Sequence, residues 1–421
     1  MSYTPSPDRY VSGMKYRRAG RSGVSLPEIT LGLWHNFGDI SPFDRSRAML
    51  LHAFDRGICH FDLANNYGPS YGSAEITFGK VMASDLAPFR HELFISTKAG
   101  YDMYPGPYGD GGSRKYLMNS LDQSLRRMQL DYVDIFYSHR YDPSTPLEET
   151  MQALVDIVRS GKALYAGISN YPAELAAEAY KYLEDRDVHC LLYQGKYNML
   201  VRGVEGPILD GAAANGTGFM AFSPLAEGLL TDRYFSGIPA GSRASRGEHL
   251  QASSITPEVV ERSRRLAEIA ASRGQTLAQM ALAWDLRDPR VTSVIIGASS
   301  LEQLDSIYHS FTCIDVQLDT FLNGCHRHIT TCEIAFDIFY KLPGIDCLQS
   351  AHDCTLFGCH LIVFKIKNLF QSINYHLDMI AKGLVLEEVV FLNVVIWHNI
   401  VYFIISTTLL HTAYGGSFNK V

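Results

Sequence analysis

Four residues whose side chains transfer or hold protons follow one another at the ends of short apolar segments. They are, in chain order, Asp62, Tyr67, Lys98 and His139. A free phenol titrates near ~10, which is too high for an easily cycled acid or base. A neighbouring ammonium favours the phenolate and lowers the pKa of the phenol, and a carboxylate can hold that ammonium in place. We therefore interpret Tyr67 as a general acid, Lys98 as the group that lowers its pKa, and Asp62 as the anchor of Lys98.

His139 completes the set as a hydrogen-bond partner for a substrate oxygen. Each residue alone also has an ordinary structural explanation. Asp62 could cap a turn, Lys98 could be a solvated strand end, and His139 could be a satisfied core histidine. Four such residues in register at three successive strand ends favour the catalytic interpretation.

The apolar segments that carry these residues belong to a longer series of short buried runs, each typical of a strand in a parallel sheet. We predict strands near residues 28–33, 58–63, 93–97, 133–138, 163–168, 190–194, 218–222 and 293–296. Between them, apolar residues recur at helical spacing near 45–56, 74–82, 114–128, 147–160 and 173–183. Thr145 and Pro146 predict a helix start, with Thr145 as the N-cap and Glu148 reaching back.

Eight strands, each followed by a helix, make a closed (β/α)8 TIM barrel more favourable than an open sheet. This α/β fold places catalytic groups at the C-terminal ends of its strands, where Lys98 and His139 lie. The segment 226–254 is rich in Gly, Ser and Arg and lacks periodicity. It is either a flap over an anionic ligand or a solvated surface loop. No Gly-x-Gly-x-x-Gly follows the first strand, so a Rossmann site is not supported.

Six motifs make the chain similar to a known family. They are Leu31-Gly-Leu-Trp34, Phe61-Asp-Leu-Ala-Asn-Asn-Tyr-Gly68, Gly109-Asp-Gly-Gly-Ser-Arg-Lys-Tyr116, Gly167-Ile-Ser-Asn170, Phe222-Ser-Pro-Leu225 and Ile296-Gly-Ala-Ser299. From about Tyr10 to about Leu304 the sequence resembles the aldo-keto reductases. Within that family it resembles the branch of bacterial L-glyceraldehyde-3-phosphate reductases and voltage-gated potassium channel β subunits.

The resemblance implies NADPH-dependent reduction of small aldehydes or ketones, such as L-glyceraldehyde 3-phosphate or methylglyoxal. Asp62, Tyr67, Lys98 and His139 match the family's catalytic tetrad. The cofactor, NADP(H), would lie extended across the barrel mouth, and the family's binding positions fall on Trp34, Asp62, Ser169, Gln194, Phe222, Ser223, Pro224, Leu225, Arg233, Arg243, Gly297, Ser299 and Gln303. No metal is implied.

Those positions have separate expected roles. Ser169 and Gln194 would hold the carboxamide, and Phe222 would stack on the nicotinamide ring. The residues expected along the pyrophosphate are Ser223, Pro224, Leu225, Arg233 and Arg243. Gly297, Ser299 and Gln303 would hold the adenosine 2′-phosphate end, and Trp34 would lie at the substrate mouth. Phe222 and Trp34 could equally be ordinary core residues.

Two departures from the family pattern concern the adenosine end. Ser300 stands where the family often has Arg or Lys for the 2′-phosphate. Ser306 and Ile307 stand where the family has a Glu-Asn pair that binds adenine. We therefore expect a barrel over residues 1–306 that lacks the remainder of its closing helix. Arg140, directly after His139, is either a contact for a substrate phosphate or a surface ion pair.

Residues 307–421 match nothing in the family and differ in composition from what precedes them. Six of the eight cysteines lie in this tail, and 389–410 is an almost continuous apolar run. A translated intron or shifted reading frame explains the abrupt change best. A membrane anchor, opposed by Asn393, His398 and Asn399, and a new globular extension are the alternatives. Zinc is weakly supported, because the cysteines form no repeated C-x-x-C pair.

Composition constrains the partners of the chain. With 47% hydrophobic residues, 19% charged residues and a net charge of −7, it is typical of a globular protein and gives no reason to expect nucleic acid. We expect a cytoplasmic location, because no signal peptide is recognisable, and the resemblance implies a homo-oligomer. Besides the reductase, a redox-sensing channel-associated subunit and a product inactivated by its C-terminus remain open.

Overall fold

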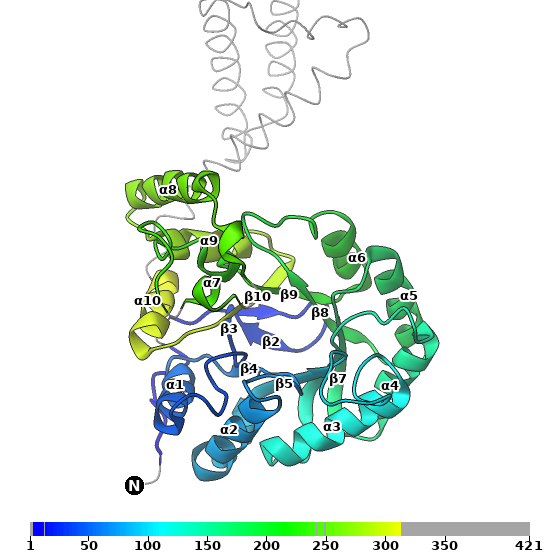
Figure 1. Ribbon diagram of the computed structural model, residues 1–421. Helices are drawn as coiled ribbons and strands as arrows, with labels where there is room; N and C mark the ends of the chain where they lie inside the picture. The colour runs from blue at the N-terminus through cyan, green and yellow to red at the C-terminus, as the bar shows by residue number, and fades with distance from the viewer. Residues whose placement is uncertain (1–2, 12, 241, 248–249, 313–421) are drawn as a thin grey trace, which may run out of the picture. The chain divides into compact units, whose positions relative to one another are not determined.

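The computed structural model describes residues 3–312, apart from 12, 241 and 248–249. Within this part the chain largely alternates between strands and helices, and all the strands except β1 and β2 form one closed sheet (Figure 1). The predicted tail, 307–421, lies outside the described residues except for its first six. The apolar run 389–410 lies wholly outside them.

Among the described residues, eight strands close into a barrel in which each strand pairs in parallel with the next, and β10 returns to β3. They are β3 (Ile29–Gly32), β4 (His60–Asp62), β5 (Phe94–Ala99), β6 (Val133–Ser138), β7 (Ala163–Ser169), β8 (Cys190–Lys196), β9 (Gly218–Phe222) and β10 (Val291–Ile296). The predicted TIM barrel and its eight strands are confirmed.

Helices surround the strands in Figure 1. The longer ones are α1 (Phe43–Asp55), α2 (Ser73–Val81), α3 (Arg114–Met128), α4 (Leu147–Arg159), α5 (Ala173–Glu184), α6 (Pro207–Asn215), α8 (Pro257–Ser272), α9 (Leu277–Leu286) and α10 (Leu301–Thr312). The five predicted helices are α1 to α5. Their amphipathic pattern reflects burial of one face against the barrel.

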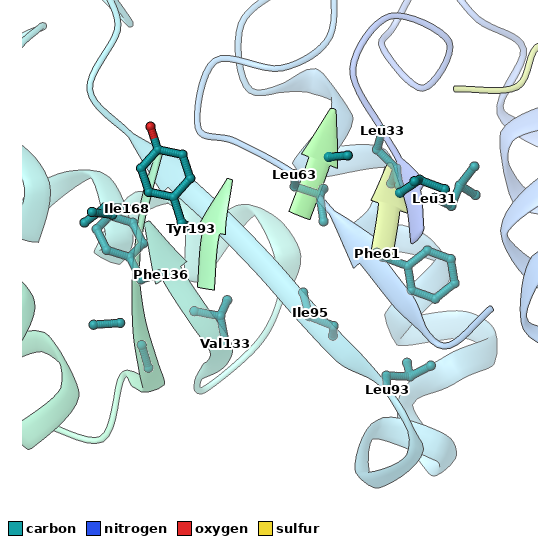
Figure 2. Packing of buried hydrophobic residues seen from close by; sticks show 14 of the residues in the cluster. Leu31, Leu33, Phe61, Leu63, Leu93, Ile95, Val133, Phe136, Ile168 and Tyr193 are labelled. Atoms are coloured by element: carbon teal, nitrogen blue, oxygen red, sulfur yellow. The ribbon is translucent and has the colours of Figure 1, made fainter. Parts of the chain in front are cut away.

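The two faces of each barrel strand meet different surroundings, because successive side chains point to opposite sides. The outer face carries apolar side chains such as Leu31, Phe61 and Ile95, which pack in the main core (Figure 2). The residues that alternate with them on β4 and β5 include His60, Asp62 and other polar groups, all buried. Polar side chains therefore fill part of the barrel interior, where branched apolar residues are usual.

A short antiparallel hairpin, β1 (Tyr16–Arg18) with β2 (Ser25–Pro27), precedes the barrel. Leu26 and Ala19 pack in a cluster with Leu192 and Ile295 from barrel strands. The hairpin thus contributes apolar contacts to the barrel. Each of its strands has three residues, too few for period-2 alternation to be recognisable in the sequence.

The predicted start of α4 is wrong in its cap. Pro146 occupies the N-cap position with no side-chain cap, and the helix begins at Leu147. The Thr145 hydroxyl instead donates to the Asp142 carboxylate over 2.7 Å. That carboxylate also accepts from Ser144 and from the backbone of Gly112. The Thr145 hydroxyl therefore binds a nearby acid in the loop and does not cap the helix.

Helix α10 follows β10 and continues past residue 306, the expected end of the barrel region. Its residues Leu304, Ile307 and Tyr308 are buried, and it packs against α1 and α9. Asp305 joins it to α1 by accepting from His52 (2.8 Å) and pairing with Arg56 (2.8 Å). The first turns after β10 are thus packed on the barrel.

The segment 226–254 contains short helical turns. They are η3 (Ala226–Gly228), α7 (Arg243–Arg246) and η4 (Ala252–Ser254). Tyr234, Ala244 and Leu250 form a small buried cluster of their own. At the start of this segment Glu227 accepts a 3.0 Å hydrogen bond from Lys196, which ends β8. The segment is therefore a folded excursion tied to the C-terminal end of the barrel.

Candidate active site

Asp62 and Lys98 form a buried ion pair at the C-terminal ends of neighbouring strands. The Lys98 ammonium lies 2.6 Å from Asp62 Oδ2 and 2.6 Å from the carbonyl oxygen of Leu63. Both side chains are almost completely inaccessible to solvent. The pairing of Asp62 with Ser96 across β4 and β5 sets this contact, because Lys98 follows Ser96 by one inward-facing position. Two of the three ammonium protons are thereby used.

Tyr67 lies in the loop after β4, with its ring against the same ammonium. Lys98 Nζ is 5.0 Å from the centre of the Tyr67 ring. The loop is fixed by a 2.9 Å hydrogen bond from the Gly68 N–H to the carbonyl of Trp34. Gly68 has a positive φ of 87°, and a Cβ there would meet Ser73 Oγ at 2.4 Å. Only glycine therefore allows the turn that carries Tyr67 to the strand end.

His139 also packs against the Tyr67 ring. The two ring centres are 5.9 Å apart, and Tyr101 packs edge-on against the imidazole at 4.7 Å. His139 is buried, and its Nδ1 has no hydrogen-bond partner among the described residues. Trp34 lies 6.3 Å from Tyr67 between ring centres. The four predicted catalytic residues are thus brought together.

The protonation of Tyr67 differs from the prediction. Burial raises the pKa of the phenol well above its ordinary value, and Asp62 and Tyr101 raise it further. The sequence predicted that Lys98 would lower it. Because Asp62 balances the charge of Lys98 at 2.6 Å, loss of solvation outweighs attraction to the cation. The phenol therefore keeps its proton at neutral pH, which is the state that a general acid needs.

Burial also governs the other two titratable groups of the site. It lowers the pKa of Lys98, and Asp62 opposes this shift. Burial, followed by the charges of Lys98 and Arg140, holds the pKa of His139 well below its ordinary value. The imidazole is accordingly neutral at physiological pH. It can donate one hydrogen bond to a carbonyl oxygen without bringing a positive charge next to Lys98.

The residues expected to hold a dinucleotide lie after the C-terminal ends of barrel strands, the side where Lys98 and His139 lie. Trp34 follows β3, Ser169 ends β7, Gln194 lies near the end of β8, and Phe222 ends β9. Gly297 follows β10 directly. In a TIM barrel these ends form one rim. The rim is thus assembled from strands far apart in the sequence.

Gln194 and Ser169 are buried at this rim. Gln194 Nε2 donates to Asp62 Oδ1 over 3.1 Å, so it touches the catalytic carboxylate directly. Ser169 Oγ accepts from Asn170 Nδ2 over 3.1 Å. Asn170 itself has a φ of 57° and donates to the carbonyl of His139. Polar groups that can pair with a carboxamide therefore stand beside the catalytic residues.

Ser223, Pro224 and Leu225 follow β9 in a sharp turn. Ser223 has a positive φ of 55°, and its carbonyl accepts from Asn198 Nδ2 over 2.9 Å. Arg233 is exposed in the following segment. Arg243 is the first residue of α7, and its side chain lies outside the described part. The segment is therefore folded at this point, and the Arg233 side chain is exposed to solvent.

The start of α10 is built from the residues expected at the adenosine end. Ser299 donates to Gln303 Oε1 both from its backbone (2.9 Å) and from its hydroxyl (3.0 Å). The Gln303 N–H in turn donates to Ser300 Oγ over 3.2 Å. A helix N-terminus with serine hydroxyls suits an anionic group. The positions present therefore fit a phosphate here through neutral donors.

Sequence reasoning missed a second set of polar residues inside the barrel. They are Thr30 on β3, His60 on β4, Ser96 on β5 and Ser293 on β10, all fully buried. Ser96 Oγ donates to Asp62 Oδ1 over 2.8 Å. The signal was period-2 spacing, because His60 and Ser96 precede Asp62 and Lys98 by two residues and share their strand face.

Comparison with known proteins assigns the chain to a family. A family model described as the aldo/keto reductase family matches residues 28–320. The chain belongs to the aldo/keto reductase family. It is therefore an oxidoreductase, from a family that generally uses NAD(P)H.

Two relatives show where this aldo/keto reductase lies within the family. L-glyceraldehyde 3-phosphate reductase of Escherichia coli (strain K12) is 54% identical over 311 residues, covering 72% of this chain and 89% of that protein. A probable voltage-gated potassium channel subunit beta of Oryza sativa subsp. japonica is 36% identical over 296 residues, covering 69% and 89%. In the part of the chain that is described, no helix has the length and apolarity that a membrane span requires.

Proposed function

We propose that this chain reduces small aldehydes with NADPH, and that L-glyceraldehyde 3-phosphate is among its substrates. The observation that carries the proposal is the buried Asp62–Lys98 pair, 2.6 Å apart, with the Tyr67 ring 5.0 Å from the ammonium. The identity of 54% to an L-glyceraldehyde 3-phosphate reductase supports the substrate. The preference for NADPH over NADH rests on family resemblance.

Each residue of the site suits one step of this reaction. A reduced nicotinamide, when bound, supplies the hydride. His139 donates a hydrogen bond to the carbonyl oxygen, which orients the aldehyde and draws electron density toward the oxygen. Tyr67 transfers its phenolic proton to that oxygen as alkoxide character develops. Lys98, held by Asp62, stabilises the phenolate that remains, so the proton is released at the moment when it is needed.

Residues for the cofactor are available along the same rim. Ser169 and Gln194 would hold the carboxamide, and Phe222 would stack against the ring. Ser223 to Leu225, with Arg233 and Arg243, would line the pyrophosphate. Gly297, Ser299 and Gln303 would take the 2′-phosphate end. The neutral donors at the start of α10 support an anion there, and Ser300 supplies no positive charge.

The first test is turnover by the full chain. NADPH oxidation should be measured with glyceraldehyde 3-phosphate, glyceraldehyde and 4-nitrobenzaldehyde, and repeated with NADH. The proposal expects turnover at about 1 s⁻¹ or faster, with NADPH preferred. A redox-sensing subunit, the alternative suggested by the channel-subunit relative, would bind NADPH tightly and turn over very slowly. Absence of both binding and turnover would instead support a product inactivated by its C-terminus.

Arg140 is proposed as the contact for the substrate phosphate. Its guanidinium lies over the Tyr101 ring at 5.2 Å, and it pairs with the half-exposed Asp110 at 3.0 Å. Its Nε is buried without a hydrogen-bond partner among the described residues. Burial, and then the charges of Lys98 and Arg140, lower the pKa of His139, which supports a position of the Arg140 cation near the imidazole.

Arg140→Met should lower kcat/KM for glyceraldehyde 3-phosphate by about 10- to 100-fold, through loss of charge-assisted hydrogen bonds. Unphosphorylated glyceraldehyde should change by less than about 3-fold, because it makes no such contact. The matched control is Arg159→Met. Arg159 is the last residue of α4, near the N-terminal end of β7, on the side of the barrel opposite to the candidate active site. Equal losses of kcat/KM on both aldehydes would mean that Arg140 only stabilises the loop around Tyr101 and does not contact the phosphate.

Two further expectations remain proposals. One is that the chain forms a homo-oligomer, which sedimentation of the purified protein would measure. The other is that residues 307–421 arise from an intron or a shifted frame, which the transcript sequence across codons 305–310 would decide. The family model matches as far as residue 320, which lies beyond the expected end of the barrel at 306.

A further inference from the structure

An uninterrupted series of hydrogen bonds runs through the barrel interior and ends on Asp62. Ser293 Oγ lies 2.9 Å from Thr30 Oγ1, which lies 2.9 Å from His60 Nδ1. On the other side of the ring, His60 Nε2 lies 3.1 Å from Ser96 Oγ, which lies 2.8 Å from Asp62 Oδ1. All five side chains are buried. The mechanism described above uses only the last of them.

The donor and acceptor of each hydrogen bond follow from the group at which the series ends, the Asp62 carboxylate. A carboxylate only accepts, so Ser96 donates its single hydroxyl proton to Asp62. Its next nearest acceptor, the Phe61 carbonyl at 3.3 Å, leads to the same result because a carbonyl also only accepts. Ser96 Oγ must therefore accept from His60. The proton of the imidazole then lies on Nε2.

The same reasoning extends to the far end of the series. Burial lowers the pKa of His60 to about 3, so the ring carries one proton at neutral pH. With that proton on Nε2, Nδ1 is an acceptor, and the Thr30 hydroxyl donates to it. Thr30 Oγ1 in turn accepts from Ser293. Every donor in the series therefore points toward Asp62.

Such alignment has an energetic consequence for the carboxylate. Hydrogen bonds that point the same way polarise one another, so the last donor is stronger than an isolated hydroxyl. Asp62 is fully buried and carries a charge, and it needs donors to compensate for lost solvation. Lys98 and Gln194 supply two and Ser96 supplies a third. If these buried polar groups served only to satisfy one another's hydrogen bonds, the series would have no reason to end on the carboxylate that holds Lys98.

We propose that His60 is a positioning residue, held as the neutral Nε2–H tautomer, which orients the Ser96 hydroxyl onto Asp62 and so fixes the carboxylate that holds Lys98. The catalytic part of this inference rests on the proposed reductase function. The tautomer does not, because it follows from the hydrogen bonds and from the burial of the ring.

The tautomer is tested directly by long-range ¹H–¹⁵N correlation spectra of the ¹⁵N-histidine-labelled full chain. His60→Gln identifies the His60 signals by their loss. The proposal expects the pattern of a neutral ring protonated at Nε2, unchanged between about pH 6 and pH 8. A ring protonated at Nδ1, or one that titrates in this range, would overturn it. This result is independent of whether the chain turns over any aldehyde.

The positioning role is tested by kinetics. His60→Gln and Ser96→Ala should each lower kcat by about 10- to 100-fold with KM nearly unchanged, as for outer hydrogen bonds that orient reactive ligands. The double variant should lose no more than the larger single loss, since both act through one contact. Thr217→Val, which removes a buried hydroxyl bonded to the Cys190 carbonyl, is the control and should change kcat by less than about 2-fold.

Two outcomes would contradict the positioning role of His60. One is a kcat of Ser96→Ala equal to that of the unmodified chain, since the contact with Asp62 would then be dispensable. The other is additive loss in the double variant, which would mean that His60 and Ser96 act separately. If His60→Gln fails to fold, Ser96→Ala still tests the contact with Asp62, and the histidine whose Nε2 signal shifts in that variant is identified as His60, because Ser96 Oγ lies 3.1 Å from this atom. If the unmodified chain shows no turnover, the proposed function fails and only the tautomer is tested.

Discussion

Lys98→Met is expected to lower kcat by about 10³-fold and the free energy of unfolding by about 3–5 kcal/mol. Methionine has nearly the length of lysine but no charge. Its introduction leaves the Asp62 carboxylate buried with no cation, although Ser96 and Gln194 still donate to it. The phenolate formed by proton transfer from Tyr67 also loses its stabilising neighbour, which stands 5.0 Å from the ring centre. Turnover and urea unfolding measure the two losses.

A second substitution separates these losses. In Asp62→Asn combined with Lys98→Met no buried charge remains unpaired, so much of the stability should return. Catalysis should not, because the cation is still missing. Parallel recovery of both quantities would mean that Lys98 acts on activity only by keeping the barrel folded. That outcome would remove the ammonium from the proposed mechanism.

Asp285→Leu is expected to raise the free energy of unfolding by about 1–4 kcal/mol at pH 7. Asp285 lies on α9, is fully buried, and has neither carboxylate oxygen hydrogen-bonded to a described residue. Burial raises the pKa of this carboxyl from an ordinary 3.8 to about 9. The folded chain must therefore take up a proton that the unfolded chain has released at neutral pH. That uptake costs on the order of 4 kcal/mol at pH 7.

The pH dependence has a definite sign. The folded state binds more protons than the unfolded state between about pH 4 and pH 9, so this group makes stability decline as pH rises through that range. Asp285→Leu should flatten the decline. Asp288 offers a control nearby: burial raises its pKa, but hydrogen bonds from Arg290 together with the charges of Arg290 and Arg287 make the net shift downward. Asp288→Asn should be destabilising at pH 7, and an equal response of the two sites would contradict this account of Asp285.

The barrel could be predicted because its strands are buried on both faces. Runs such as Val133–Ser138 are therefore recognisable without any partner strand. The four proposed catalytic residues were recognisable for a related reason, since each stands at or just after the end of such a run. A local sequence pattern is sufficient to predict a residue's position when that position depends only on one strand and the loop that follows it.

What could not be predicted depends on contacts between distant segments. Thr30 and Ser293 are 263 positions apart in the chain and meet only after the barrel closes. The pKa of Tyr67 was predicted in the wrong direction because its burial is invisible in the sequence, whereas its charged neighbours are not. Thr145 does not cap the helix as predicted, because its hydroxyl donates to Asp142 and Pro146 takes the N-cap position. In each case the deciding partner was set by the fold.

The central claim is that Tyr67 delivers the proton to a carbonyl oxygen, and Tyr67→Phe tests it most directly. Phenylalanine keeps the ring beside Lys98 and removes only the acidic hydroxyl. NADPH binding should be measured by fluorescence and turnover of glyceraldehyde 3-phosphate by absorbance, on the same preparation. The account predicts a kcat lower by about 10³-fold with the Kd for NADPH changed by less than about 3-fold. Turnover equal to that of the unmodified chain would contradict it.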